Sequence, residues 1–144
     1  MRWKDRVVEE LSEQNMFQSS AHKSRFKELL DCYVTAPFFT KGLCKCMYLS
    51  CWDEEHFIIM LDMLNKLRLS ENMNLLDMNE NGELMAEEAE AADSYENYVM
   101  RLSCALLMGE PFDVDGLPQD LDPQGRFLID KALKASAIID SIPK

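Results

Sequence analysis

Apolar residues recur every three to four positions along most of the chain, a spacing that is typical of amphipathic helices. Residues that can cap a helix, together with prolines, indicate the boundaries. The pattern predicts a first helix over about residues 2–15, a second that Ser19 or Ser20 caps and Pro37 ends, and a third from about Phe38 to Ser50. A fourth helix is capped by Asp53, and a short fifth is capped by Ser70. A sixth covers about residues 84–108 with an interruption near Asp93 and Ser94, and a last helix over about 123–141 follows the cap Asp122.

Two of these helices are apolar on nearly every side. They are the third, with Phe39, Leu43 and Met47, and the fourth, which runs through Phe57 and Leu67. A helix without a polar face belongs at the centre of a fold. The sequence therefore predicts an all-α fold, a compact single-domain bundle of six to seven helices with two central apolar helices.

The composition supports one helical domain spanning residues 1–144. Hydrophobic residues make up 47% of the chain, and there are only 5 Gly and 5 Pro. No long linker, internal repeat, signal peptide or apolar run of membrane-spanning length is present. The five cysteines are an odd number, which favours free thiols in a reducing compartment. We expect a cytoplasmic protein.

The charge is concentrated in the second half of the chain. Residues 1–68 hold ten basic and ten acidic side chains, whereas residues 71–122 hold fourteen acids and a single base, Arg101. Such a segment repels phosphate, which argues against direct binding of nucleic acid or of an anionic membrane surface. It is either a solvated face, a cation site or a surface for a basic partner protein.

We place the predicted contact surface for such a partner in the middle of this acidic segment. Its residues are Glu83, Glu87, Glu88, Glu90, Asp93 and Glu96.

Residues 77–88 also match the twelve-residue calcium-loop pattern. Calcium would take oxygens from positions 1, 3, 5, 7 and 12, with a glycine at the turn. In this sequence the metal ligands would be Asp77, Asn79, Asn81, Glu83 and Glu88, and the glycine would be Gly82. Met85 stands where a polar ninth residue is usual, and no second full loop is present. The alternative is an acidic helix-turn-helix that Asn81-Gly82 breaks. No other cofactor is indicated.

Other candidate sites have weaker patterns. Cys44, Cys46 and Cys51 lack the paired spacing of structural zinc sites and suit buried thiols. His22 and His56 lie in no catalytic motif, so we expect the protein not to be an enzyme.

Seven methionines lie at helical spacing and have two interpretations. They would either fill the core or line an adaptable groove. They are Met60, Met63, Met73, Met78, Met85, Met100 and Met108.

Three short segments resemble an uncharacterised family of small proteins from mobile elements and phages of low-GC Gram-positive bacteria. They are His22-Lys23-x-Arg25-Phe26-x-x-Leu29-Leu30, Met47-Tyr48-Leu49 and Arg101-Leu102-x-x-x-Leu106. The tryptophan-containing stretch of that family is missing before the third segment. The resemblance implies no catalytic residues. It implies an accessory role, such as binding and inhibiting a host defence nuclease.

From these observations we expect a non-enzymatic accessory or inhibitor protein that binds a basic or nucleic-acid-binding protein through its acidic surface. An anti-CRISPR-like mimic of nucleic-acid charge is one concrete form. The alternative is a calcium-binding helical domain.

Overall fold

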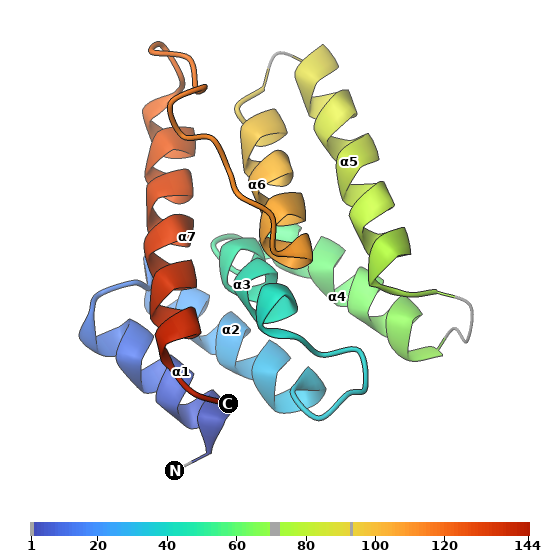
Figure 1. Ribbon diagram of the computed structural model, residues 1–144, viewed down its shortest axis with the longest axis vertical. Coiled ribbons are helices and arrows are strands. Elements are labelled where there is room, and N and C mark those ends of the chain that lie inside the picture. The colour runs from blue at the N-terminus through green and yellow to red at the C-terminus, as the bar shows by residue number, and fades with distance from the viewer. Residues whose placement is uncertain (1, 70–72, 93) are drawn as a thin grey trace.

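The computed structural model describes residues 2–69, 73–92 and 94–144 and contains seven helices (Figure 1). Every regular element in these residues is an α-helix, which confirms the all-α prediction. The helices are α1 (Trp3–Glu13), α2 (Ser20–Tyr33), α3 (Lys41–Ser50), α4 (Glu54–Leu69), α5 (Leu75–Ala91), α6 (Glu96–Met108) and α7 (Pro123–Ser141). They pack around one continuous hydrophobic core.

Several of the predicted helix ends are confirmed. Ser19 caps α2 by accepting a hydrogen bond from the backbone N–H of His22. Asp122 caps the start of α7, because its side chain accepts a hydrogen bond from the backbone N–H of Gln124. Gly109 ends α6 with a φ of 69°, in the left-handed region. Such caps satisfy backbone groups that have no partner within the helix.

The start of the third helix differs from the prediction. α3 begins at Lys41 rather than near Phe38, because the Thr40 side chain caps it by accepting from the N–H of Leu43. Pro37 lies in the turn between α2 and α3 and belongs to neither helix.

The two central helices are α3 and α6. α3 packs against α2, α4, α6 and α7, and α6 packs against α3, α5 and α7. The prediction that the fourth helix is central was wrong: α4 packs mainly on α2 and α3, and its Ile58 is 56% exposed. Its apolar residues are too many for one contact face, so part of them remain at the surface.

A glycine allows the two central helices to approach closely. A Cβ atom on Gly42 of α3 would lie 2.7 Å from the carbonyl oxygens of both Leu106 and Leu107 on α6. Since these are backbone atoms, any larger residue would push the helices apart.

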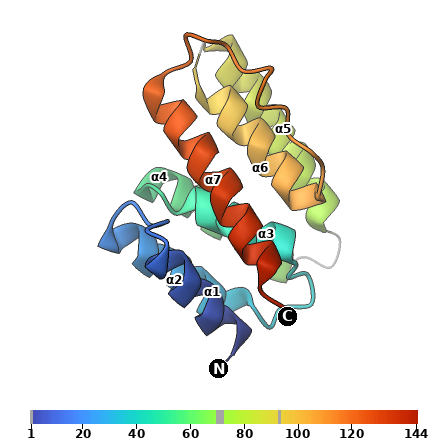
Figure 2. The ribbon, with the colours of Figure 1, turned by 60° about the vertical axis from the view of Figure 1, so that its left-hand side comes forward.

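The two ends of the chain meet at one side of the bundle, where the N and C labels lie close together in Figures 1 and 2. The indole N–H of Trp3 donates to the carbonyl of Ile142 at 3.2 Å, and the Lys41 ammonium donates to the same oxygen at 3.0 Å. These bonds join α1, α3 and the end of α7.

α5 and α6 form an antiparallel helical hairpin on the opposite side of α3 from α1 and α2 (Figures 1 and 2). The sequence predicted a break at Asn81-Gly82, but α5 continues through both residues. The predicted interruption falls between Ala91 and Glu96, as expected. The proposed cap Ser70 and the residue Asp93 lie outside the described residues.

A buried asparagine holds the hairpin together. The Asn97 side chain donates to the carbonyl of Ala86 at 2.7 Å and accepts from Arg101 Nε at 3.2 Å.

Within the described ranges, no helix is long and apolar enough to cross a membrane.

Candidate functional site

The acidic residues of the predicted contact surface are divided between two helices. Glu83, Glu87, Glu88 and Glu90 are all exposed on α5. Glu96 lies in the first turn of α6.

On α5, three of these glutamates form one stripe with Glu80. The positions 80, 83, 87 and 90 are three or four residues apart and so share one side of the helix. Glu88 lies about 100° around the helix from Glu87 and belongs to a different side. We call Glu80, Glu83, Glu87 and Glu90 the acidic stripe.

The acidic stripe carries little charge compensation. Glu90 pairs with Arg101 Nη2 at 3.0 Å, an exposed ion pair of small stabilising value. Glu83 accepts from the side-chain amide of Asn79 at 3.2 Å. Over the chain that the structure describes, Glu80 and Glu87 have no basic group within 4 Å. The stripe therefore presents net negative charge to solvent.

Glu96 is engaged with a histidine instead of joining the stripe. Its Oε1 lies 3.4 Å from His56 Nε2, while His56 Nδ1 lies 2.8 Å from Asp53 Oδ1. The imidazole is nearly buried and stacks on Trp52, with the ring centroids 4.8 Å apart. Asp53 also accepts from the N–H of His56, so it caps α4 as predicted. This cluster fixes the turn between α3 and α4.

The prediction of a calcium loop at 77–88 was wrong about the local structure, because the whole segment is helical. In a helix, side chains two residues apart point about 200° apart. Asp77, Asn79 and Asn81 therefore do not converge on one point. Calcium binding by Asp77, Asn79, Asn81, Glu83 and Glu88 stays a prediction from the sequence, and here it would require α5 to unwind.

Two interactions explain why this segment is helical. Asn74 and Asp77 form a capping box: the Asn74 side chain accepts from the N–H of Asp77, and Asp77 Oδ2 accepts from the N–H of Asn74 at 2.8 Å. The first predicted calcium ligand thus serves as a helix cap. Gly82 packs against α6, where an added Cβ would lie 2.8 Å from Cys104 Sγ. Glycine was needed for helix packing and not for a turn.

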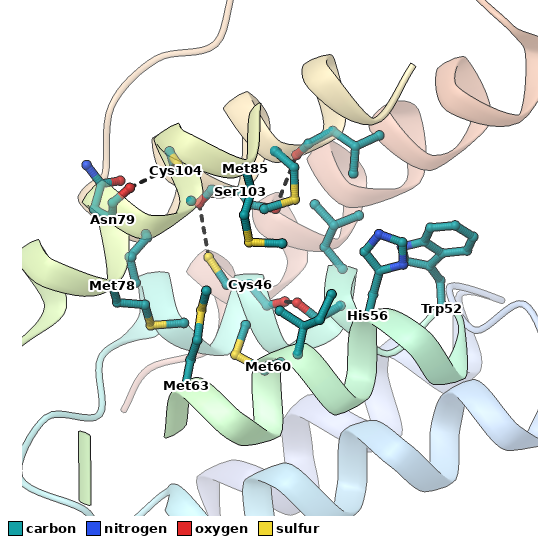
Figure 3. A pocket seen from close by; sticks show the side chains of 17 residues that line it. Cys46, Trp52, His56, Met60, Met63, Met78, Asn79, Met85, Ser103 and Cys104 are labelled. Carbon is teal, nitrogen blue, oxygen red and sulfur yellow. Dashed lines mark hydrogen bonds between the residues drawn. The ribbon is translucent and has the colours of Figure 1, made fainter. Parts of the chain in front are cut away.

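Five of the seven methionines line one pocket, and two of these five, Met60 and Met78, also belong to the buried core, so both interpretations stay open. The pocket lies between α3, α4, α5 and α6, and Figure 3 shows sulfur atoms from several of these elements directed into it. Its cavity volume is about 50 Å³. We call it the methionine pocket. Its sulfur-bearing residues are Cys46, Met60, Met63, Met78, Met85, Met100 and Cys104. Met73 and Met108 are not among its lining residues.

Three of the five cysteines are buried thiols, and Cys104 is half-buried. Cys44, Cys46 and Cys51 are buried, and this burial raises the pKa of each thiol well above its usual value. Burial also raises the pKa of Cys104, to about 11. Cys32 is exposed. In the described part of the chain, no cluster of three or more His, Cys, Asp or Glu side chains could hold a metal ion.

The first two segments that carry the family resemblance lie against each other and are structural. His22 is buried, and its Nε2 donates to the carbonyl of Tyr48 at 2.9 Å while its Nδ1 accepts from the N–H of Gln18. Arg25 donates to the carbonyl of Cys51 at 3.2 Å. These bonds join α2 to the end of α3. The residues of the first two segments thus define how two helices pack.

His22 gives the protein a pH-dependent stability. Burial is the main cause that lowers its pKa below 6.5, the nearby Arg25 charge lowers it further, and the hydrogen bond to Tyr48 opposes both. Between the folded and unfolded pKa values, the unfolded chain binds more protons at this site. The contribution of His22 is therefore complete above pH 6.5 and is lost as the pH falls through this window.

We expect urea denaturation to show the free energy of unfolding falling between pH 7.5 and 5.5, by at most about 1.4 kcal/mol per pH unit from this residue. The variant His22→Gln should be less stable at pH 7.5 but should lose less stability on acidification. Equal slopes in the two proteins would show that His22 does not cause the effect.

Comparisons with protein-family models, curated proteins and solved structures found no match to this chain. The resemblance to the mobile-element family remains a hypothesis that rests on the three segments.

The sequence did not predict where the methionine pocket lies, although it singled out the five methionines among its seventeen lining residues. The signal was present in α5, where Met78, Gly82 and Met85 recur at spacing four and three. Which other helices complete the pocket depends on the packing of α4 and α6, and that packing has no local sequence signal.

Proposed function

We propose that the protein is a non-enzymatic binding protein whose acidic stripe on α5 contacts a basic partner protein. The observation that carries this proposal is the row of exposed carboxylates on a single helix side, with one ion pair among four residues. Uncompensated charge of one sign speeds association with a partner of opposite charge.

The spacing of the carboxylates favours a partner whose natural ligand is a nucleic acid. Four carboxylates along residues 80–90 span about 15 Å of helix, or about one charge per 5 Å. One DNA strand carries a phosphate about every 3.4 Å of helix axis. The stripe thus offers a comparable line of negative charge, and an inhibitor that occupies the nucleic-acid channel of a defence nuclease is the concrete form we propose.

The test is capture of proteins from the lysate of a low-GC Gram-positive bacterium on immobilised protein. We expect the triple variant Glu83→Lys, Glu87→Lys, Glu90→Lys to lose the captured basic proteins while its circular dichroism stays helical. Added duplex DNA should compete for the same captured proteins, because both ligands would use one channel.

The matched control is Glu9→Lys, Glu13→Lys, Glu28→Lys on α1 and α2. These three glutamates are also exposed, and the change in net charge is identical. The control should retain capture. If the two triple variants behave alike, net charge rather than the stripe decides binding, and the proposal is wrong.

A further inference from the structure

We propose that the methionine pocket binds the apolar face of a basic amphipathic helix supplied by a partner protein. This inference rests on the proposed function in one respect, since both assign a basic partner to the acidic half of the chain. It adds the partner's secondary structure, its apolar anchors and the place where they insert.

The size of the pocket favours an anchoring side chain over a small-molecule ligand. Its cavity volume is about 50 Å³. Pockets for cofactors and drug-sized ligands usually measure about 300–1,000 Å³. An engineered apolar cavity of about 150 Å³ holds a single benzene. A third of that volume holds about two carbon atoms, so a full aliphatic side chain enters only if the lining side chains move.

The lining is suited to such an insertion. Met63, Met85 and Met100 are half-buried around the pocket, whereas Met60 and Met78 are buried deeper. Methionine is unbranched and adapts its shape to an incoming apolar group. Figure 3 shows Met60 and Met63 from α4 facing Met78 and Met85 from α5 across the pocket. The half-buried methionines can thus move aside and then cover an inserted side chain.

None of the lining residues is acidic, but the side of α5 next to the pocket carries acidic residues. Asp77, Asn81 and Glu88 follow one another at spacing four and seven and so share one side of the helix. This side adjoins Met78 and Met85. It lies away from α6, which α5 meets on its other side through Ala86 and Glu90.

The opposite rim on α4 carries the same sign of charge. Glu55, Ile59, Asp62 and Lys66 share one side of the helix at spacing four, three and four, and Ile59 lines the pocket. Lys66 pairs with Asp62 at 3.0 Å, so these two charges offset each other and Glu55 leaves this side of α4 net negative. An apolar pocket between two acidic rims selects a partner whose apolar residues are flanked by lysine or arginine.

A helix meets these requirements with a short segment. Its apolar residues at positions i, i+3 and i+4 form one stripe, and basic residues on both sides of the stripe face the two rims. An anchor from this stripe would enter the pocket, and Lys or Arg would lie near Asp77, Glu88 and Glu55.

The probe is an 18-residue leucine–lysine peptide with the leucines on one helical face, titrated into protein labelled with ¹³C at the methionine methyl groups. We expect the methyl resonances of Met63, Met85 and Met100 to shift. The resonances of Met16 and Met47 should not, since both are buried elsewhere in the core. A peptide of the same composition with its leucines scattered around the helix should bind about tenfold more weakly.

Substitutions locate the contact. Met85→Gln should weaken peptide binding about tenfold, whereas Met108→Gln, a matched change at an exposed methionine of α6, should not. Thermal melts of both variants establish that they fold. Replacing every lysine of the peptide by glutamate should abolish binding.

Three results would overturn the inference. They are equal binding of the ordered and scattered peptides, equal binding of the lysine and glutamate peptides, and shifts of the pocket methyl groups on dilution without peptide, which would identify a second copy as the occupant. The triple variant Glu83→Lys, Glu87→Lys, Glu90→Lys separates this inference from the proposed function. If the proposed function fails, this variant captures the same lysate proteins as the unmodified protein. If the inference fails, the ordered peptide binds the unmodified protein no better than the scattered or the glutamate peptide, whatever the capture result.

Discussion

Replacing Phe26 by alanine is expected to lower the free energy of unfolding by about 3–5 kcal/mol, because a fully buried aromatic ring would be lost. Phe26 has no exposed surface. Its ring packs edge-on against Tyr48, with centroids 6.1 Å apart, and against Phe17 at 5.8 Å. The same cluster contains His22, so the cavity would open at the junction of α2 and α3.

A loss of this size is a large share of the total stability of a small domain, about 5–15 kcal/mol. We expect the melting temperature to fall by roughly 10–20 °C. Urea denaturation followed by circular dichroism measures the effect. The control is Phe127→Ala on α7, where the ring is 45% exposed and the change should be within about 0.5 kcal/mol. Similar losses at the two positions would contradict the packing of α2 on α3.

The second large effect is expected at Gly42, where replacement by alanine should destabilise the fold by about 2 kcal/mol. Alanine is the better helix former by about 1 kcal/mol, so propensity alone predicts a gain. The added methyl group, however, would lie 2.7 Å from two carbonyl oxygens of α6. Backbone atoms cannot rotate away, so α3 and α6 must separate and lose packing along their contact.

The control for this second prediction is Gly116→Ala. A Cβ there would meet the side-chain oxygen of Asp113 at 2.9 Å, and an exposed carboxylate can move. We expect little change in the melting temperature for Gly116→Ala and a fall of roughly 6 °C for Gly42→Ala. A stabilised Gly42→Ala protein would show that the two central helices lie farther apart than described.

These two positions show what local sequence signals can and cannot predict. Phe26 belongs to a clear 3.6-residue pattern, so its burial follows from the amphipathic spacing of α2. Gly42 lies in a helix where glycine has no local advantage, and its role depends on a second helix more than sixty residues away in the chain. A sequence pattern within α3 carries no information about that partner.

The candidate site in the acidic segment was also predicted only in part from the sequence. The fourteen acids of residues 71–122 were evident from composition, and four of the proposed contact residues are exposed on one helix. Glu96 differs because the fold brings His56 of α4 to within 3.4 Å of it. The calcium pattern predicted the wrong local structure because its Asn-Gly pair is a common turn signal, whereas here Gly82 is held in a helix against Cys104.

The sequence by itself determined that the chain is helical, where several helices begin and end, much of the buried face of each amphipathic helix, and where the negative charge lies. These properties depend on spacing and capping within a few residues. Tertiary packing alone decided that α6 rather than α4 joins α3 at the centre, that Gly82 lies against Cys104 within a continuous α5, and that five methionines from three helices form one pocket. The reason is that each depends on free energy gained between segments distant in the chain, and that energy overrides the weak local preferences of the residues involved.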